Sequence, residues 1–180
     1  MADKCILCNT VEGKTKLEKV YDDGKVTAVV HPRGAAVGHV FVFPNKHYQI
    51  FEQIPDYEAG HLFDVVNKIS IAVFEALGVQ GTNIILQNGV AAGQEIPHVC
   101  VHIIPIKEGD GIDFQWEPKR ITEEQLSTVE EKLKKAASDI GEFEKEKKKK
   151  EVKVKKKEKK KIDAEKEKEN YMIKQLERIP

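Results

Sequence analysis

The chain has 180 residues, of which 33% are charged and 40% are hydrophobic. It is therefore too highly charged for an ordinary compact domain and too apolar to be fully disordered. The formal net charge is zero, but residues 1–118 carry 9 Lys and Arg against 15 Asp and Glu, whereas residues 119–180 carry 21 against 15. We expect an acidic globular domain over residues 1–118 and an amphipathic, lysine-rich C-terminal extension over residues 119–180.

Several classes of protein are excluded by the distribution of apolar residues and cysteines. No apolar run approaches the roughly 20 residues of a membrane-spanning helix, and the first residues lack the apolar stretch of a secretory signal. Three cysteines, two of them Cys5 and Cys8, do not make a disulfide scaffold. In a reducing compartment their spacing indicates metal or redox chemistry. We therefore expect a cytoplasmic protein with no membrane partner.

The first elements in chain order are a hairpin and a buried strand. Leu17–Val20 and Val26–Val30 flank a turn around Gly24, a pattern typical of two antiparallel strands. His39–Phe43 is almost wholly apolar and is followed by Pro44, which predicts a buried strand that stops there.

A long helix and two further strands follow. Apolar residues recur at helical spacing over residues 56–77, and Gly78 is a suitable helix terminator. Ile84–Leu86 predicts a strand, residues 89–93 form a loop of small residues, and residues 98–103 alternate as a strand does. Strands, a helix and strands joined by short loops predict an α+β domain with an antiparallel sheet and flanking helices.

The C-terminal extension begins near Thr122. Leu126, Val129, Leu133, Ile140 and Phe143 recur every three or four residues, which predicts an amphipathic helix. Residues 145–161 then hold 12 Lys against 3 Glu. This block is either a solvated helix face or tail, or a surface that attracts nucleic-acid phosphates without sequence preference. The apolar stripes on either side, the second of which contains Met172 and Leu176, could instead pair with each other or with a second subunit.

A candidate metal site starts from Cys5 and Cys8, whose spacing suits two thiolates on one ion. Such a pair is half a site, so two more ligands must come from elsewhere, and the chain has six histidines. With His47 and His98 the pair would complete a Cys₂His₂ tetrahedron, a closed and therefore structural zinc site. From the spacing alone, a redox pair or a free dithiol is an equally good interpretation.

The segment from Asn88 to Pro105 carries the strongest indication of chemistry. Period-two spacing places His98, Cys100 and His102 on one strand face, just after a glycine-rich loop that contains Gln94. Backbone N–H groups near glycines, an amide and imidazoles together suit a phosphate, and a nucleophile beside a proton donor suits phosphoryl or nucleotidyl transfer.

These residues resemble the histidine triad (HIT) family of nucleotide hydrolases and transferases. The family pattern is three histidines that alternate with apolar residues, after a loop with Asn-Gly and Gly-Gln. Here Asn88-Gly89 and Gly93-Gln94 precede His98-Val99-Cys100-Val101-His102. Further matches are Gly38-His39, Lys46-His47 and the Cys5/Cys8 pair, so the resemblance covers roughly residues 4–116.

The resemblance implies a fold, a reaction and a set of residue roles. HIT domains are α+β and commonly pair into homodimers. They act at the α-phosphate of purine nucleoside phosphoramidates or dinucleoside polyphosphates through a covalent nucleotidyl-enzyme. By this resemblance, His102 and Gln94 contact the phosphate or the leaving group, Asn88 and Gly93 orient the phosphate, and structural zinc is bound by the family's positions matching Cys5, Cys8, His47 and His98.

The chain departs from the family pattern at the nucleophile. The middle histidine of the pattern corresponds to Cys100, and a free cysteine is only a few per cent thiolate at neutral pH. We therefore expect impaired catalysis. Three explanations of Cys100 compete: a recent or introduced change in a normal enzyme, a natural change that leaves a non-catalytic nucleotide-binding module, and a working thiol nucleophile. A nucleic-acid-associated HIT protein, recruited through residues 145–161, is a further alternative.

A second departure lies in the region that binds ribose. Many relatives carry Asp or Asn at the position of His31, and an imidazole there can still hydrogen-bond ribose hydroxyls. His31 is therefore a candidate substrate-binding residue with altered preference, and we expect His39 to be a structural or supporting residue.

Overall fold

The computed structural model describes residues 5–138, 140 and 141. In chain order these residues form α1 (Ile6–Val11), β1 (Lys19–Asp22), β2 (Val26–Val30), β3 (Val40–Pro44), η2 (Phe51–Gln53), α2 (Asp56–Leu77), β4 (Gly81–Leu86), η3 (Val90–Ala92), β5 (Val101–Ile106) and α3 (Glu123–Ala136). The chain divides into two compact units, residues 1–146 and 147–180, and the second lies outside the described residues. The predicted boundary after residue 118 stays a prediction.

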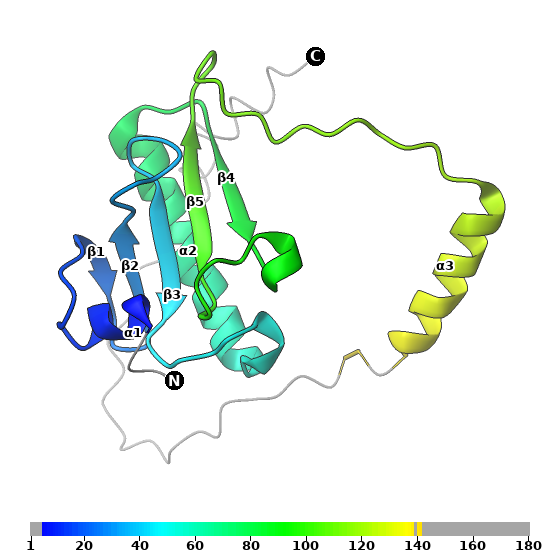
Figure 1. Ribbon diagram of the computed structural model, residues 1–180, viewed down its shortest axis with the longest axis horizontal. Coiled ribbons are helices and arrows are strands. Elements are labelled where there is room, and N and C mark those ends of the chain that lie inside the picture. Colours follow the sequence, from blue (N-terminus) through cyan, green and yellow to red (C-terminus); the bar gives the residue numbers. More distant parts are fainter. Residues whose placement is uncertain (1–4, 139, 142–180) are drawn as a thin grey trace, which may run out of the picture. The chain divides into compact units, whose positions relative to one another are not determined.

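The five strands form one antiparallel sheet in the order β1-β2-β3-β5-β4 (Figure 1). Because successive side chains on a strand point to opposite faces, each central strand contributes to two separate layers. Val26, Val40, Val42, Val101 and Ile103 belong to a core cluster that includes the buried residues of α2. The α+β fold with an antiparallel sheet and flanking helices is therefore confirmed.

The opposite face of the sheet carries the candidate site. Val29, Phe41 and Phe43 project from β2 and β3 on this side and pack with Leu7 of α1 and with Cys100. Since α1 is only six residues long, it leaves part of this face open. Figure 1 shows α2 on one side of the sheet and α1 by the other.

The long helix α2 agrees with its predicted bounds. Its buried side chains, Leu62, Val65, Val66, Ser70 and Val73, follow the helical period, which is why one face packs against the sheet. Asp56 and Glu58 lie in the first turn, where negative charge favours the helix dipole. Gly78 ends the helix with φ 57°, a left-handed conformation that glycine adopts without strain.

Several strand boundaries differ from the sequence-based predictions: β1 covers Lys19–Asp22 rather than Leu17–Val20, and β4 begins at Gly81 rather than at Ile84. Pro44 is the last residue of β3 rather than the residue after it. β5 begins at Val101, not at residue 98, because His98 N–H bonds to Ile96 O and Val99 N–H bonds to Tyr48 O instead of to a neighbouring strand.

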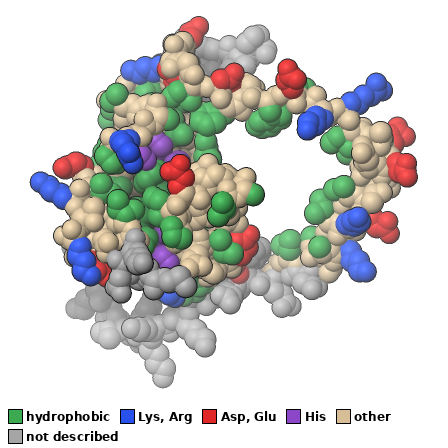
Figure 2. Space-filling model, viewed as in Figure 1, with side chains coloured by type: hydrophobic (Ala, Val, Ile, Leu, Met, Phe, Trp, Pro, Cys, Tyr) green, Lys and Arg blue, Asp and Glu red, His purple; other side chains and the backbone are tan. Residues whose placement is uncertain are grey.

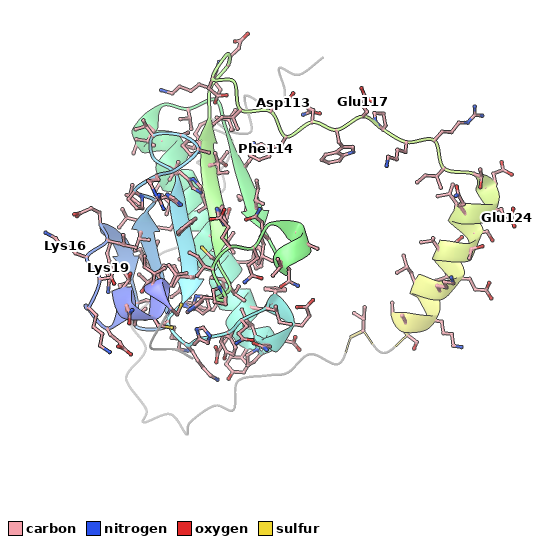
Figure 3. All side chains as sticks on the ribbon, in the orientation of Figure 1. Lys16, Lys19, Asp113, Phe114, Glu117 and Glu124 are labelled. Atoms are coloured by element: carbon pink, nitrogen blue, oxygen red, sulfur yellow. The ribbon has the colours of Figure 1, made fainter. Side chains whose placement is uncertain are left out.

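The segment that follows β5 leads to α3. Residues 111–122 form no regular element, and Figure 3 labels Asp113, Phe114 and Glu117 in it. α3 begins with a capping box, in which Thr122 Oγ1 accepts from Gln125 N–H and the Gln125 side chain accepts from Thr122 N–H. The helix covers the predicted apolar positions Leu126, Val129 and Leu133.

The rest of the predicted extension, including Phe143, the lysine block 145–161 and the stretch with Met172 and Leu176, lies outside the described residues. In the part of the chain that the structure describes, no helix is both long and apolar enough to cross a membrane.

Candidate functional site

The four predicted metal ligands come together from four parts of the fold. Cys5 precedes α1, Cys8 lies within it, His47 follows β3 and His98 precedes β5. Their ligand atoms all lie within 4.8 Å of one another. Cys5 Sγ and Cys8 Sγ lie 3.4 and 3.5 Å from His98 Nδ1, and Cys8 Sγ and His98 Nδ1 each lie 3.2 Å from His47 Nδ1.

These distances suit a tetrahedral ion. Metal–ligand bonds of about 2.0–2.3 Å place the ligands of a tetrahedral zinc roughly 3.3–3.8 Å apart. The His98 ring is also oriented for metal binding, since its Nε2–H donates to Pro44 O at 2.9 Å and leaves the Nδ1 lone pair facing the sulfurs. Burial lowers the pKa of His98 to about 4, which keeps the ring neutral as a ligand must be.

The Cys8 thiol of the cluster is harder to ionise without a cation. Burial, together with the neighbouring Cys5, raises the pKa of the Cys8 thiol to about 11. A bound divalent cation would reverse this preference because it stabilises the thiolate directly. The donor set and its geometry therefore fit a closed metal site.

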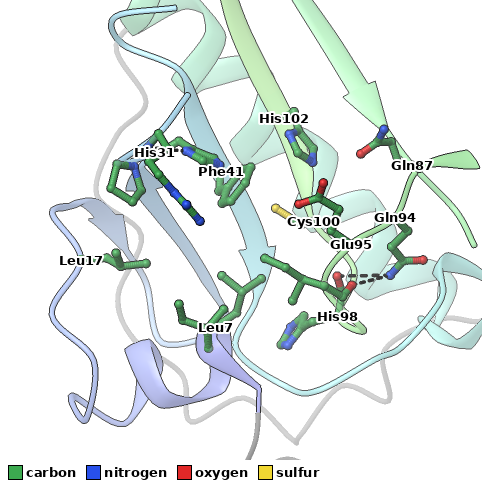
Figure 4. A pocket seen from close by; sticks show the side chains of 15 residues that line it. Leu7, Leu17, His31, Phe41, Gln87, Gln94, Glu95, His98, Cys100 and His102 are labelled. Atoms are coloured by element: carbon green, nitrogen blue, oxygen red, sulfur yellow. Dashed lines mark hydrogen bonds between the residues drawn. The ribbon is translucent and has the colours of Figure 1, made fainter. Parts of the chain in front are cut away.

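Next to this cluster lies a cavity of about 720 Å³, a volume in the usual range for small-molecule sites. It is lined by Ile6, Leu7, Leu17, His31, Pro32, Arg33, Phe41, Gln87, Gly93, Gln94, Glu95, Ile96, His98, Cys100 and His102 (Figure 4). Figure 2 shows histidine side chains exposed on this face among hydrophobic ones. The cavity thus combines an apolar lining with a few polar groups.

Two imidazoles, of which His102 lines the cavity and His39 lies behind it, are ordered by a chain of hydrogen bonds. The backbone N–H of Ala35 donates to His39 Nδ1 at 3.1 Å, and His39 Nε2 lies 3.2 Å from His102 Nδ1. Because His39 Nδ1 must accept, the proton of neutral His39 is on Nε2 and is donated to His102. Neutral His102 therefore carries its own proton on Nε2.

His31 is oriented in a similar way, since its Nδ1 accepts from the Arg33 backbone N–H at 2.9 Å. Its ring stacks on His39 with centroids 4.8 Å apart and meets the edge of Phe41 at 4.2 Å. Burial lowers the pKa of His31 and His102, and lowers that of His39 to about 4. At neutral pH these rings are uncharged N–H donors.

Cys100 lies on the floor of the cavity and is only 8% exposed. Burial raises the pKa of its thiol, although a hydrogen bond with the Val42 backbone opposes this effect. Neither flanking histidine is placed to take its proton, because His98 is held by Pro44 and the cysteines and His102 Nδ1 is occupied by His39. The thiol is therefore protonated at neutral pH.

The glycine-rich loop is held together by its own residues. Gln94 Oε1 accepts from Gly89 N–H at 2.8 Å, and Gln94 Nε2 donates to Gln49 O and Ile96 O. The backbone N–H groups of Ala92, Gly93 and Gln94 also bond within the loop. These amides are thus engaged with the protein itself rather than free for a phosphate.

Gly93 is required in this loop for two reasons. Its φ is +88°, and a Cβ at this position would lie 2.5 Å from Gln87 Nε2. The glycine therefore makes room for the Gln87 side chain in the cavity wall. Gln87 follows β4 directly, opposite Cys100, since Leu86 pairs with Val101.

The predicted site residues fall into three groups. His31, Gly93, Gln94, Cys100 and His102 line the cavity. The metal-ligand set gathers beside it, and His98 belongs to both. Asn88 is not among the lining residues: its Oδ1 accepts from Phe51 N–H and its Nδ2 donates to the Glu52 carboxylate, which fixes the loop between β3 and α2.

Three polar residues of the cavity were not singled out from the sequence, namely Arg33, Gln87 and Glu95. Arg33 lies two residues after His31, Gln87 precedes Asn88 and Glu95 follows Gln94. Each lies within two residues of a motif residue, and cross-strand pairing of β4 with β5 is the signal that would have indicated Gln87.

Residues 12–109 match the model of the HIT domain. The chain belongs to the HIT family. An uncharacterised HIT-like protein of Methanocaldococcus jannaschii is 41% identical over 107 residues, which cover 59% of this chain and 82% of the relative. The adenylylsulfatase HINT3 of Arabidopsis thaliana is 30% identical over 78% of this chain and 67% of its own. An adenosine 5′-monophosphoramidase of Candida albicans is 26% identical over 76% of this chain and 93% of its own.

Solved structures of the HIT family have the same fold. A HIT protein of Bacillus subtilis superimposes with a TM-score of 0.69 at 30% identity, over 73% of this chain and 96% of its own. A zinc-bound histidine triad protein of Mycobacterium smegmatis superimposes with a TM-score of 0.60 at 27% identity, over 76% of this chain and 99% of its own. The homologues named for an activity are nucleotide hydrolases, and the resemblance to the HIT family is confirmed.

Proposed function

We propose that this chain is a HIT nucleotide hydrolase or nucleotidyl transferase that acts at the α-phosphate of purine nucleoside phosphoramidates or dinucleoside polyphosphates. The observation that carries the proposal is the cavity in which His31, Cys100 and His102 lie beside Gly93 and Gln94. The names of the adenylylsulfatase and adenosine phosphoramidase relatives support a purine nucleotide as substrate.

The side chains of the cavity divide the work of binding. We assign the phosphate to N–H donors on the side chains of His102 and Gln87, because the backbone amides of Gly93 and Gln94 are occupied within the loop. His31 and Arg33 add a ring N–H and a positive charge at the opposite wall, where ribose hydroxyls or a second phosphate would lie. Gln94 and Asn88 then serve as positioning residues that hold the loops around the cavity.

We also propose that Cys5, Cys8, His47 and His98 hold a structural zinc ion. The closed Cys₂His₂ set leaves no open position for a substrate, so the ion would supply rigidity rather than Lewis-acid chemistry. The support is the grouping of the ligand atoms within 4.8 Å and the bond from His98 to Pro44 O. Ile6 and Leu7 lie between the two cysteine ligands and line the cavity, so the zinc would fix one cavity wall.

The covalent route of the family is impaired in this chain, because the nucleophile position holds a buried, protonated thiol. A second candidate function, a nucleotide-binding module without catalysis, is favoured by this same observation. The hydrolase and the binding module would both bind the nucleotide, but only the hydrolase would turn it over.

The test measures AMP release from adenosine 5′-phosphoramidate and from a diadenosine polyphosphate by this chain, Cys100→His and Cys100→Ala. We expect slow release by the parent chain and faster release by Cys100→His, since an imidazole is a nucleophile at neutral pH without prior ionisation. Loss of release in Cys100→Ala alone would identify a working thiol nucleophile. Failure of all three proteins on both substrates, with AMP still bound, would leave the binding module.

We further propose a homodimer in the cytoplasm. Phe114 and Trp116 are 40% and 83% exposed in the segment after β5, and apolar side chains of this size favour burial against a partner. Sedimentation equilibrium of the parent chain and of Trp116→Ala tests this state. A monomer at micromolar concentration would refute it.

A further inference from the structure

Glu95 is the one carboxylate-bearing residue among those that line the cavity. It follows Gln94, whose side chain is fixed by bonds to Gly89, Gln49 and Ile96, so the backbone that carries Glu95 is held firmly. In the view of Figure 4 its carboxylate is drawn between the Cys100 sulfur and the His102 ring, and Glu95 itself is an exposed residue at the cavity mouth. The negative charge of Glu95 acts on both His102 and His31, because it raises the pKa of each ring and so opposes the effect of burial.

The thiol of Cys100 has no imidazole base to activate it. A cysteine is activated by a neighbouring base or cation, yet His98 is committed to Pro44 O and the cysteine cluster, and His102 Nδ1 accepts from His39. Around Cys100 pack apolar side chains, among them Leu7 and Phe43. Neither flanking histidine is therefore placed to accept the proton of the thiol.

A cysteine at this position also changes the space above the floor of the cavity. The side chain of cysteine is much smaller than the imidazole that the family pattern has there, so a water molecule can lie between the sulfur and a bound α-phosphate. Glu95 faces this space, and His102 contributes an Nε2–H whose direction is set by the chain of bonds from Ala35 through His39.

We propose that Glu95 is the general base of a direct, one-step hydrolysis at the α-phosphorus and that the neutral His102 ring hydrogen-bonds the phosphate. The oxygen of the water forms the new P–O bond while the P–N or P–O bond to the leaving group breaks. The Glu95 carboxylate takes the proton of the water and passes it to the departing atom, while His102 keeps its Nε2 proton and donates it in a hydrogen bond to a phosphate oxygen. The carboxylate is thereby restored, and no covalent nucleotidyl-enzyme forms. This inference rests on the proposed nucleotide hydrolase function.

The first experiment measures turnover of adenosine 5′-phosphoramidate by the parent chain, Glu95→Gln and Glu108→Gln. Glu108 is an exposed glutamate after β5 and lies outside the cavity lining, so its variant is a matched control. We expect Glu95→Gln to lower kcat about 10²- to 10³-fold, the usual contribution of a general base, with little change in KM. Formate should restore part of the activity of Glu95→Ala, because a small carboxylate can occupy the vacated position.

The second experiment quenches the parent chain and Cys100→His with acid during turnover of a dinucleoside polyphosphate labelled in the adenosine 5′-phosphate. We expect protein-bound label in Cys100→His and none in the parent chain. Label on the parent chain, or turnover of Glu95→Gln equal to that of Glu108→Gln, would overturn the direct route while leaving the hydrolase function intact. Absence of turnover by the parent chain on both substrates would refute the hydrolase function and the direct route together.

Discussion

Replacing His39 by asparagine should remove one defined part of the acid sensitivity of the fold, beside the parts that come from the other buried histidines. His39 is 5% exposed, and burial lowers its pKa from an ordinary 6.5 to about 4. Above pH 6.5 neither the folded nor the unfolded chain protonates this ring. Between 6.5 and 4 only the unfolded chain binds the proton, so the free energy of unfolding falls as the pH falls through this range.

The size of the effect follows from the two pKa values. Proton linkage at one site with these values removes about 2.5 kcal/mol of stability between about pH 7.5 and about pH 4.5. Asparagine is the chosen replacement because its Oδ1 can still accept from Ala35 N–H, as His39 Nδ1 does at 3.1 Å. The variant loses the titrating ring and keeps the local backbone bond.

Urea denaturation at both pH values, with a chelator present throughout, measures this effect free of any change in metal binding. We expect the parent chain to lose about 2.5 kcal/mol more than His39→Asn on acidification. Val29→Ala, a fully buried position on the same sheet face, should lower stability at both pH values and keep the acid-induced loss. An equal loss in the parent chain and His39→Asn would refute the assignment of the proton to this residue.

Two further predictions concern the metal cluster and the glycine loop. The purified chain should hold one zinc ion by atomic emission, and Cys8→Ser should lose both the ion and several kcal/mol of stability. Cys100→Ser is the control and should keep its full zinc content and an unchanged response to chelators. Parent protein that is free of zinc and has an undiminished Tm would contradict this prediction. Gly89→Ala and Gly93→Ala both place a side chain at positive φ, and each should lower the free energy of unfolding by about 1–3 kcal/mol. Only at Gly93 does the new Cβ displace Gln87, so the affinity for AMP measured by calorimetry should fall further in Gly93→Ala. Equal affinities of the two variants would count against a role for Gln87.

Much of the fold follows from local patterns in the sequence. The apolar spacing of residues 56–77 determines α2 because a long amphipathic helix has one face that must be buried. β1 was harder to place: its four side chains are all exposed, so no alternation of burial marks its limits, and it lies at Lys19–Asp22 rather than at Leu17–Val20. Edge strands are defined by their partner, here β2, and a partner is not visible in a local window of sequence.

The site was predictable to the extent that its residues carry a recognisable spacing. Cys5 and Cys8 indicate half of a metal site by themselves. His47 and His98 were proposed among six histidines from the sequence, and the resemblance to the HIT family then supported that choice over a redox pair. Arg33, Gln87 and Glu95 could not be found in this way. Their position in the cavity depends on the pairing of β4 with β5 and on the bonds of Gln94, which are contacts between distant or irregular segments.

The position of Cys100 explains how a change at the nucleophile can leave the fold intact. Alternation along the chain sends Val101 and Ile103 into the core with α2, while Cys100 packs with Leu7 and Phe43 on the other face. Cysteine is a small, apolar side chain when protonated, so this environment accommodates it without an unpaired charge. His98 is bound differently, since its ring joins the cysteine cluster to Pro44 O. Residue 100 packs in the same apolar cluster as Cys5 and Cys8, but it is not one of the four residues whose ligand atoms form the metal cluster. A change of its chemistry therefore leaves the proposed ligand set complete, which is the condition under which a different base, such as Glu95, can take over the reaction.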